Sequence, residues 1–492
     1  MVKRKRPDAA KDDKPATPSS KAIKATATAT EAPDVALRLQ IVTGSYERVL
    51  HGFTAGIPAS CLGPAKSDSS SVQCVDSFLF EAHGSAIRCL ALSPTPKATD
   101  PAEAPKVILA SGGTDERINL YSLSAAPPAV NDEYPSVPTL AGNKILENPK
   151  NRELGSLLHH SATISALVFP SRSKLLAAAE DNTISVSKTR DWSVVSTIKA
   201  PGPKVQGRPS GDTAPPGAAP SGVNHFAVHP SMKLMLSVGR GERCMRLWNL
   251  VTGKKAGVLN FGREVLQSVK ESRWSSGEGR RIAWNPEGEN FAVAFEWGAV
   301  VFGIDSTPKC RVLPSPRSKL HQMKYISLGE DQADELLAVS TEDGRVIFYS
   351  TMVLQKAEED DESPIPHATP VAQIGGKQAG LPGRIKDFEI LGLEGQSKEF
   401  RDNFLVVTGN SDGVVRIWKI TGKELAAKPS ADETRQVGDL LTTYETGNRI
   451  TCLASFIMLP AEDPSTLLDS EADEEEEEEE EAESSSDESD EE

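Results

Sequence analysis

The stretch "AHGSAIRCLALSP" (residues 82–94), followed after a Pro-rich gap by "VILASGGTDERINLYSL" (residues 107–123), decides the fold of this chain. Its apolar residues alternate with polar ones in short runs bounded by Gly, Pro, Ser and Asp, which is the pattern of half-buried β-strands joined by tight turns. His83 precedes the first run, and Asp115 lies in the turn between the other two. Neither side chain is required to form the strand or turn in which it lies, so we expect both to make contacts in the folded structure.

The same pattern recurs along the whole chain. Each copy has an alternating run, a turn rich in small residues with a polar tip, and a second apolar run, and the seven copies are residues 39–53, 107–123, 174–189, 233–250, 290–304, 336–350 and 404–420. One more alternating strand precedes most copies, and another follows. Units of four strands repeated seven times are the signature of a WD40-type propeller. The sequence therefore predicts an all-β, seven-bladed WD40 β-propeller.

The first unit lacks the strand that should precede its hairpin. The segment "NRITCLASFIML" (residues 448–459) has the pattern of the missing strand, although it lies near the other end of the chain. We therefore expect this C-terminal strand to lie beside Leu39–Thr43 and to complete the first blade. Closure of the ring would remove the exposed sheet edges that an open array leaves.

The paired His and Asp residues are interpreted as a structural network. In WD40 units, a His before the first strand hydrogen-bonds to the Asp of the following hairpin turn, and His83 with Asp115 fits this pairing, with Ser111 placed to extend it. Asp181 fits the same pairing with His160 or His159. The alternative is an Asp–His–Ser catalytic triad, but the scaffold already explains the spacing, and spacing alone does not establish triad geometry. No enzyme motif accompanies these residues, so we predict no enzymatic activity.

Charge divides the chain into three parts. The net charge of the 492 residues is −16, yet residues 469–492 contain 17 acidic residues and no Lys or Arg. We predict a disordered basic tail at 1–34, the propeller at 35–460 and a disordered acidic tail at 461–492. The cluster Lys3, Arg4, Lys5 and Arg6 is typical of a nuclear localisation signal, with a solubilising tail as the alternative. Acid-flanked serines are candidate phosphorylation sites: Ser484, Ser485, Ser486 and Ser489.

The sequence offers little sign of a metal, a cofactor or a membrane span. The six cysteines form no CxxC pair, which fits a reducing compartment and gives no zinc site. His225 and His229 lie on one predicted strand, where their side chains would be about 13 Å apart. We therefore expect no bound metal and no cofactor, and no apolar run is long enough to span a membrane.

Basic residues gather in loops predicted to lie on one face, here called the upper face. This face comprises the loops before each unit's first strand and the turns between its second and third strands. Its candidate partner-binding residues are Arg240, Arg243, Arg263, Lys270, Arg273, Trp274, Arg280 and Arg281. The hypothesis is a positive surface for phosphates or acidic peptides, and the alternative is a solvated rim of mixed charge. Low-complexity insertions at 54–76, 93–106, 124–152, 355–372 and 423–437 are predicted for the opposite, lower face.

Several segments resemble one WD40 subfamily. They are "IVTGSYERVLHGF", "AHGSAIRCLALSP", "LASGGTDERINLY", "EDNTISVSKTRDW" and "VNHFAVHPSMKLMLSVGRGERCMRLWNLVTGKKAG". Together they resemble the maintenance-of-killer and PAK-interacting-protein family of ribosome assembly factors, chiefly over residues 37–350. The turn "GRGER" and the insertion at 201–222 depart from the family pattern.

The resemblance implies a nuclear and nucleolar, non-enzymatic factor for the large (60S) ribosomal subunit. Such a factor would act as a monomer within a larger complex, binding proteins of the pre-60S particle and, as a further partner, pre-rRNA. A second reading is a regulator that binds and inhibits a p21-activated-type kinase. A third, a ubiquitin-ligase substrate receptor, lacks its usual WDxR signal, because the matching sites read "LWNL" and "IWKI".

Overall fold

The computed structural model describes a chain made almost entirely of β-strands. The described residues are 35–63, 72–96, 105–128, 137–138, 144–202, 221–272, 274–329, 335–355, 364–381, 383–393, 400–427 and 434–460. Short helices interrupt the strands at α1 (Ala59–Leu62), α2 (Arg263–Ser268), η1 (Lys377–Ala379) and α3 (Gly422–Ala426). No helix in these ranges has the length and apolar character required to cross a membrane.

Four sheets have four antiparallel strands each, in which the second and third strands form the predicted hairpin. The first contains β4 (Ile87–Leu92), β5 (Lys106–Gly113), β6 (Ile118–Ser124) and β9 (Arg152–Leu157). The next contains β10 (Ile164–Ser171), β11 (Lys174–Ala179), β12 (Thr183–Lys188) and β13 (Val194–Lys199). Then come β14 (Val223–Val228), β15 (Leu234–Gly239), β16 (Cys244–Asn249) and β17 (Lys254–Asn260). The last contains β26 (Ile385–Gly392), β27 (Asn403–Asn410), β28 (Val414–Thr421) and β30 (Asp439–Glu445).

A nine-stranded sheet follows the β14–β17 sheet in the chain. One part contains β18 (Arg281–Trp284), β19 (Asn290–Ala294), β20 (Ala299–Gly303) and β21 (Pro308–Val312). The other contains β22 (Leu320–Ser327), β23 (Glu335–Thr341), β24 (Arg345–Gln355) and β25 (His367–Gly375), with β29 (Arg435–Gln436) added beside β25. A parallel bridge between Arg311 and His367 joins the two parts.

The remaining sheet unites the two ends of the described chain. Its order is β31 (Ile450–Ile457), β1 (Val35–Ser45), β2 (Val49–Pro58), β3 (Gln73–Glu81), β8 (Lys144–Ile145) and β7 (Val137–Pro138). β31 runs antiparallel to β1, with Leu39 opposite Ile457 and Thr43 opposite Leu453. This is the pairing that the sequence pattern predicts for residues 448–459.

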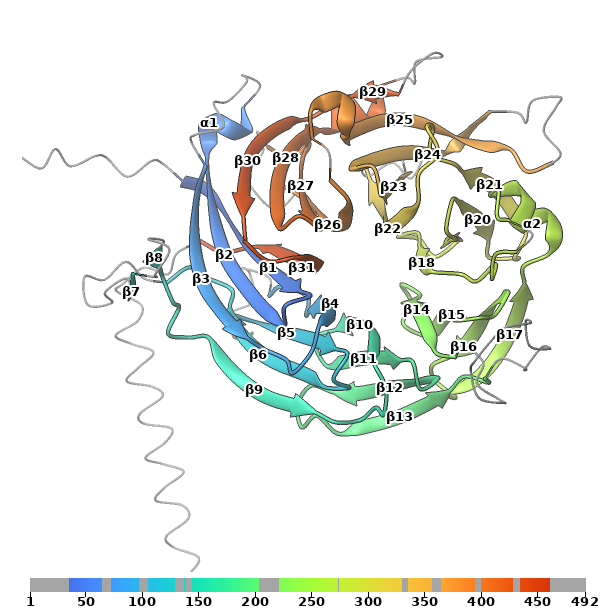
Figure 1. Ribbon diagram of the computed structural model, residues 1–492, viewed down its shortest axis with the longest axis horizontal. Helices are drawn as coiled ribbons and strands as arrows, with labels where there is room; N and C mark the ends of the chain where they lie inside the picture. The colour runs from blue at the N-terminus through green and yellow to red at the C-terminus, as the bar shows by residue number, and fades with distance from the viewer. Residues whose placement is uncertain are drawn as a thin grey trace, which may run out of the picture. The chain divides into compact units, whose positions relative to one another are not determined.

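The first strands of successive four-stranded groups contact one another in turn. β31 contacts β4, and the contacts continue through β10, β14, β18, β22 and β26, which contacts β31 again. In Figure 1 these strands face the centre of the view, and strands such as β13 and β17 lie at its outside. Apolar clusters fill the spaces between neighbouring groups: Ile41 and Phe53, for example, pack with Val407 and Ile417 across the first and last groups. Removal of this apolar surface from water is the main stabilising term.

Some of the predicted low-complexity insertions are shorter than expected. β2 continues to Pro58, and α1 follows with Cys61 and Leu62 buried, so residues 54–62 belong to the packed structure. Similarly, β25 begins at His367, inside the segment predicted as a loop. The few apolar residues in these polar segments are enough to hold them against the sheets.

Candidate functional site

The predicted pairing of His83 with Asp115 is present as a closed network. His83 Nδ1 lies 3.0 and 3.1 Å from the two carboxylate oxygens of Asp115, and Nε2 lies 2.8 Å from Ser111 Oγ. The backbone N–H of Gly84 also donates to Asp115 Oδ2, at 3.0 Å. A Cβ atom at Gly113 would lie 2.4 Å from Asp115 Oδ1 and 2.6 Å from His83 Nδ1, so this position has room only for glycine. The network ties the loop before β4 to the turn between β5 and β6.

His160, rather than His159, makes the equivalent contacts in the next sheet. Its Nδ1 lies 3.3 Å from Asp181 Oδ2 and 2.9 Å from Thr183 Oγ1, and its Nε2 lies 2.8 Å from Ser185 Oγ. Burial lowers the pKa of His160, although Asp181 acts against this shift. Burial tends to raise the pKa of Asp181, but hydrogen bonds from Thr183 outweigh it and lower that pKa. The second network therefore holds a neutral imidazole beside an ionised carboxylate near pH 7.

The serine hydroxyls of these networks lie behind the imidazoles. Ser111 has 0% and Ser185 2% of its surface exposed. A nucleophile must reach a substrate carbonyl, and neither hydroxyl faces solvent. The geometry favours the structural interpretation over the catalytic triad.

Other hairpin turns use different partners for their acids. Asp343 Oδ2 accepts from Arg345 Nε at 2.9 Å, and Arg345 also donates to the backbone oxygens of Ser315 and Pro316 at 2.6 and 2.8 Å. Arg345 thus ties this turn to the loop before β22, as His83 does in its own sheet. In the "GRGER" turn, Glu242 pairs with Arg246 of β16. Arginine can replace the His because its several N–H groups reach a carboxylate and carbonyls at once.

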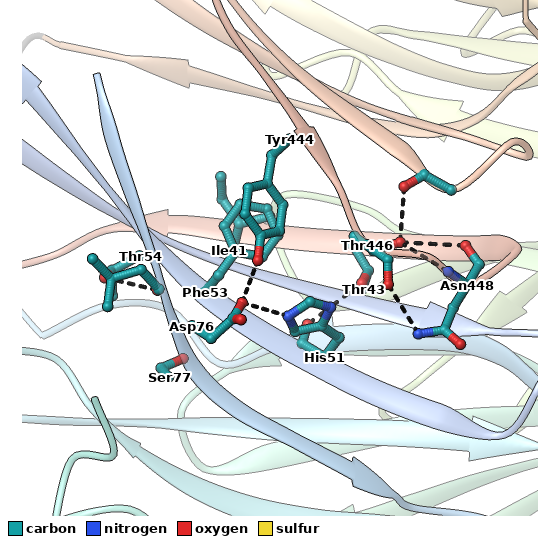
Figure 2. Close-up of polar contacts among 12 residues, drawn as sticks. Ile41, Thr43, His51, Phe53, Thr54, Asp76, Ser77, Tyr444, Thr446 and Asn448 are labelled. Atoms are coloured by element: carbon teal, nitrogen blue, oxygen red, sulfur yellow. Dashed lines mark hydrogen bonds and ion pairs between the residues drawn. The ribbon is translucent and has the colours of Figure 1, made fainter. Parts of the chain in front are cut away.

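A third His–Asp pair was not predicted from the sequence. His51 Nε2 of β2 lies 2.7 Å from Asp76 Oδ1 of β3, and the hydroxyl of Tyr444 in β30 donates to the same oxygen. Figure 2 shows the three side chains converging, with the Phe53 ring beside Tyr444; the two ring centroids are 4.2 Å apart. The available signal was a polar residue inside two apolar strands, "VLHGF" and "CVDSF".

This cluster connects the sheet that contains β1–β3 to the sheet that contains β26–β30. His51 and Asp76 are 4% and 5% exposed, so Asp76 accepts from a buried imidazole and from the half-buried Tyr444 hydroxyl. Burial raises the pKa of Tyr444, and its hydrogen bond to Asp76 raises it further, so the phenol stays protonated. The same two sheets are linked a second time by Lys419 of β28, whose Nζ donates to the backbone oxygen of Gly63, just after α1, at 2.8 Å.

A cavity of about 410 Å³ lies among the first strands. Polar side chains of its wall include Arg281, Asp387 and His225. Asp387 accepts from Gln322 Nε2 at 3.2 Å and from the backbone N–H of Leu453 at 3.0 Å. Burial lowers the pKa of His225 to about 3, so this imidazole is neutral at physiological pH.

Arg281 corrects one prediction for the upper face. It was expected in an exposed loop, but it is the first residue of β18, and its side chain lines the cavity and donates to His321 O at 3.3 Å. The alternation of the strand explains the difference, since successive side chains point to opposite sides.

The other predicted upper-face residues are largely engaged. Arg240 pairs with Glu180 at 2.9 Å, and Arg280 pairs with Glu296 at 3.3 Å. The guanidinium of Arg243 donates to the backbone oxygens of Ser275 and Ser276, both at 2.9 Å. Charged and aromatic groups exposed around α2 are Arg263, Glu264, Lys270 and Trp274, the last 88% exposed. Acids of the same sheet and of a neighbouring sheet thus neutralise part of the positive charge that the sequence places here.

Some predicted residues lie outside the described ranges. They are Arg273, the basic cluster Lys3, Arg4, Lys5 and Arg6, and the serines Ser484, Ser485, Ser486 and Ser489. Within the described ranges, no group of three His, Cys, Asp or Glu side chains could hold a metal ion.

Comparison with known proteins agrees with the repeated sheets. The family profile "WD domain, G-beta repeat" matches residues 72–122 and 151–186, which include the His83–Asp115 and His160–Asp181 networks. The chain contains WD40 repeats. Three relatives extend the similarity beyond these repeats. A p21-activated protein kinase-interacting protein 1-like protein of Xenopus laevis is 24% identical, over 85% of this chain and 82% of its own. Protein MAK11 of Saccharomyces cerevisiae is 26% identical over the same shares, and Shk1 kinase-binding protein 15 of Schizosaccharomyces pombe is 26% identical over 64% and 69%.

Proposed function

We propose that this protein is a non-enzymatic scaffold in the assembly of the large (60S) ribosomal subunit. The observation that carries the proposal is similarity across 85% of the chain to Protein MAK11 and to the kinase-interacting relatives. The proposed location is the nucleus and nucleolus, supported by the resemblance of several segments to the ribosome assembly factors of that group. Its partners would be proteins of the pre-60S particle, with pre-rRNA as a further candidate.

The proposed platform is a closed, seven-bladed propeller formed by residues 35–460, flanked by tails at 1–34 and 461–492. Two observations support it. The nine-stranded sheet consists of two antiparallel four-stranded parts joined by one parallel bridge, so each part counts as a blade. The first strands also contact one another in an unbroken cycle through β31. A rigid ring of this kind presents many turns to partners at once.

The upper face around α2 is the proposed docking surface for the pre-60S particle. Trp274 offers a large exposed aromatic side chain, with the cations of Arg263 and Lys270 on the same segment. Trp and Arg are enriched where proteins bind one another. Alanine substitution of Trp274 and Arg263 should therefore reduce particle binding without unfolding the sheets.

The test is affinity purification of the tagged full chain from its source organism, followed by sucrose-gradient sedimentation and measurement of the bound RNA. We expect co-sedimentation with large-subunit precursors and a loss of 60S subunits on depletion. The Trp274→Ala, Arg263→Ala variant should recover at least several-fold less precursor than Met232→Ala, Val251→Ala, a control that alters exposed residues of the lower face. Purification without any ribosomal precursor would refute the proposal.

A second candidate function is regulation of a protein kinase. The names of two relatives describe proteins that interact with or bind a kinase. This function predicts direct, stoichiometric binding of the purified chain to a p21-activated-type kinase and a fall in kinase activity. Kinase binding in the absence of pre-60S association would favour this candidate over the first.

A further inference from the structure

The lower ends of the β10–β13 and β14–β17 sheets carry a group of unpaired cations. We call this group the lower basic face; it consists of Lys174, Lys188, Arg190, Lys233, Lys254 and Lys255, all exposed. Within the part of the chain that the structure describes, none of the six forms an ion pair, whereas Arg240, Arg280 and Lys319 on the upper face all do. The lower turns of these two sheets contain a single acid, Asp191. Its Oδ1 already accepts from the backbone N–H and hydroxyl of Ser193, at 3.1 and 2.8 Å.

Like charges are placed against one another on this face. Lys174 of β11 lies directly opposite Lys188 of β12. Like charges directly opposite in an antiparallel pair destabilise the pair. An anion bound at this face would remove that repulsion.

The two sheets bring their cations onto one continuous surface. Ile184 and Ile198 of one sheet pack in a single apolar cluster with Phe226 and Trp248 of the next. At the lower ends, a Cβ at Gly253 would lie 3.6 Å from Ser196 Oγ of β13, so the turn before Lys254 lies against the neighbouring sheet. The surface ends at the next lower turn, which carries Glu287 and Glu289.

The described chain ends close to this surface. The backbone N–H of Leu459 donates to Ala125 O at 2.8 Å, and that of Ala125 donates to Pro105 O at 2.7 Å. Arg172, in the turn between β10 and β11, donates to the backbone oxygen of Lys106, the residue after Pro105, at 3.1 Å. A short series of contacts thus leads from the end of β31 to the sheet that carries Lys174.

We propose that the acidic segment 469–492 docks on the lower basic face of its own chain. Its 17 acidic residues are opposite in charge to the cations of the face, and it begins nine residues after Pro460. Nine extended residues span about 30 Å, enough to cross from one lower turn to the next sheets. Tethering raises the effective concentration of the segment to about the millimolar range, so many weak ion pairs suffice. The docked segment shields the face from other polyanions, and phosphate groups on Ser484, Ser485, Ser486 or Ser489 would strengthen the attraction.

Zero-length carbodiimide cross-linking of the full-length protein tests the contact directly. We expect peptides from 469–492 linked to Lys174, Lys188, Lys233, Lys254 or Lys255, and loss of these links in high salt, which screens exposed charges. A mixture of light and heavy isotope-labelled protein separates links within one chain from links between chains. Equal linking to exposed Lys270 and Lys377 of other turns, or links mainly between chains, would overturn the proposal.

A binding measurement provides the second readout. Deletion of 469–492 should increase affinity for a fluorescent 20-nucleotide RNA by about tenfold or more at low salt, because the intramolecular competitor is gone. Lys188→Glu with Lys254→Glu should abolish the gain, while the charge-matched pair Lys377→Glu with Lys423→Glu, at exposed sites outside both proposed surfaces, should leave it unchanged. If the RNA protects these lysines in the full-length chain while the acidic segment forms no links to them, the face is a nucleic-acid site and the proposal is wrong.

Discussion

The His83–Asp115 pair and the His51–Asp76 pair combine the same two residue types, His and Asp, at different places in the fold. The first closes a turn within one sheet, and its Asp side chain is 14% exposed. The second lies between the first and last sheets, where both side chains are 5% exposed and a third donor, Tyr444, comes from 368 residues away. The turn network therefore orders one hairpin, whereas the buried cluster holds together the two ends of the described chain.

The largest expected effect is at Asp76. Replacement of Asp76 by Ala removes this acceptor from the buried His51 Nε2 and the half-buried Tyr444 hydroxyl, and each lost partner costs about 1–3 kcal/mol. We expect the free energy of unfolding to fall by about 3 kcal/mol, against about 1–2 kcal/mol for Asp115→Ala, whose donors are closer to water. Urea denaturation followed by tryptophan fluorescence measures both. Asp76→Asn, which keeps an acceptor oxygen, should fall between the two, and an equal loss for both alanine variants would contradict the comparison.

Acid should destabilise the protein through imidazoles that lack a carboxylate partner. Burial holds the pKa of His225 and that of His321 at about 3, whereas an unfolded His titrates near 6.5. Below pH 6.5 the unfolded chain therefore binds protons that the folded chain does not, and the free energy of unfolding decreases as pH falls. Between pH 6.5 and 5 we expect a loss of about 2 kcal/mol for each residue.

The variant His225→Gln distinguishes this effect from general acid denaturation. Glutamine does not titrate, so the variant should lose less stability than the wild type between pH 6.5 and 5, when both are measured by urea denaturation. His159→Gln, at an exposed site, is the control and should retain the wild-type slope. Identical slopes for all three proteins would show that His225 takes up its proton while the protein is still folded.

Much of the fold follows from the sequence because its information is local. Alternation and turn residues locate the hairpins, and the fixed relation between a loop His and the next turn Asp identifies His83 with Asp115 and His160 with Asp181. Even the pairing of β31 with β1 follows, because residues 448–459 repeat the pattern of residues 87–92 and one unit lacks a strand. Each of these inferences compares one short segment with another.

The features that were missed depend on contacts between sheets. Tyr444 meets Asp76 only after β30 and β3 are brought together, and no spacing in the sequence encodes that distance. The upper face was predicted from a count of basic residues, but Glu180 pairs with Arg240 across a sheet boundary, and Glu296 pairs with Arg280 between a loop and a turn of one sheet. The unpaired lysines of the lower face were overlooked for the same reason, because the sequence does not show which cations lack an acidic neighbour in space.

A steric substitution probes the turn network without deleting a polar group. In Gly113→Ala the new methyl group would approach Asp115 Oδ1 and His83 Nδ1 far inside van der Waals contact, so the network must open. We expect a loss of about 1–3 kcal/mol in the free energy of unfolding, the usual cost of overpacking. Gly262→Ala is the matched control, because a Cβ there meets nothing within 4 Å, and its effect should stay within about 0.5 kcal/mol. A tolerated Gly113→Ala would mean that the His83–Asp115 contact contributes little to stability.

The smallest effect isolates the hydrogen bond of Tyr444 from its packing. Tyr444→Phe keeps the ring that stacks on Phe53 but removes the donor to Asp76, so the expected loss is about 1 kcal/mol, the net value of one buried hydrogen bond. Tyr46→Phe, at a side chain that is 61% exposed, should change nothing measurable. Because Tyr444→Phe leaves the carboxylate of Asp76 with His51 as a partner, its cost must be smaller than that of Asp76→Ala. A Tyr444→Phe loss equal to that of Asp76→Ala would instead assign the whole connection between the first and last sheets to the Tyr444–Asp76 bond, with His51 contributing none of it.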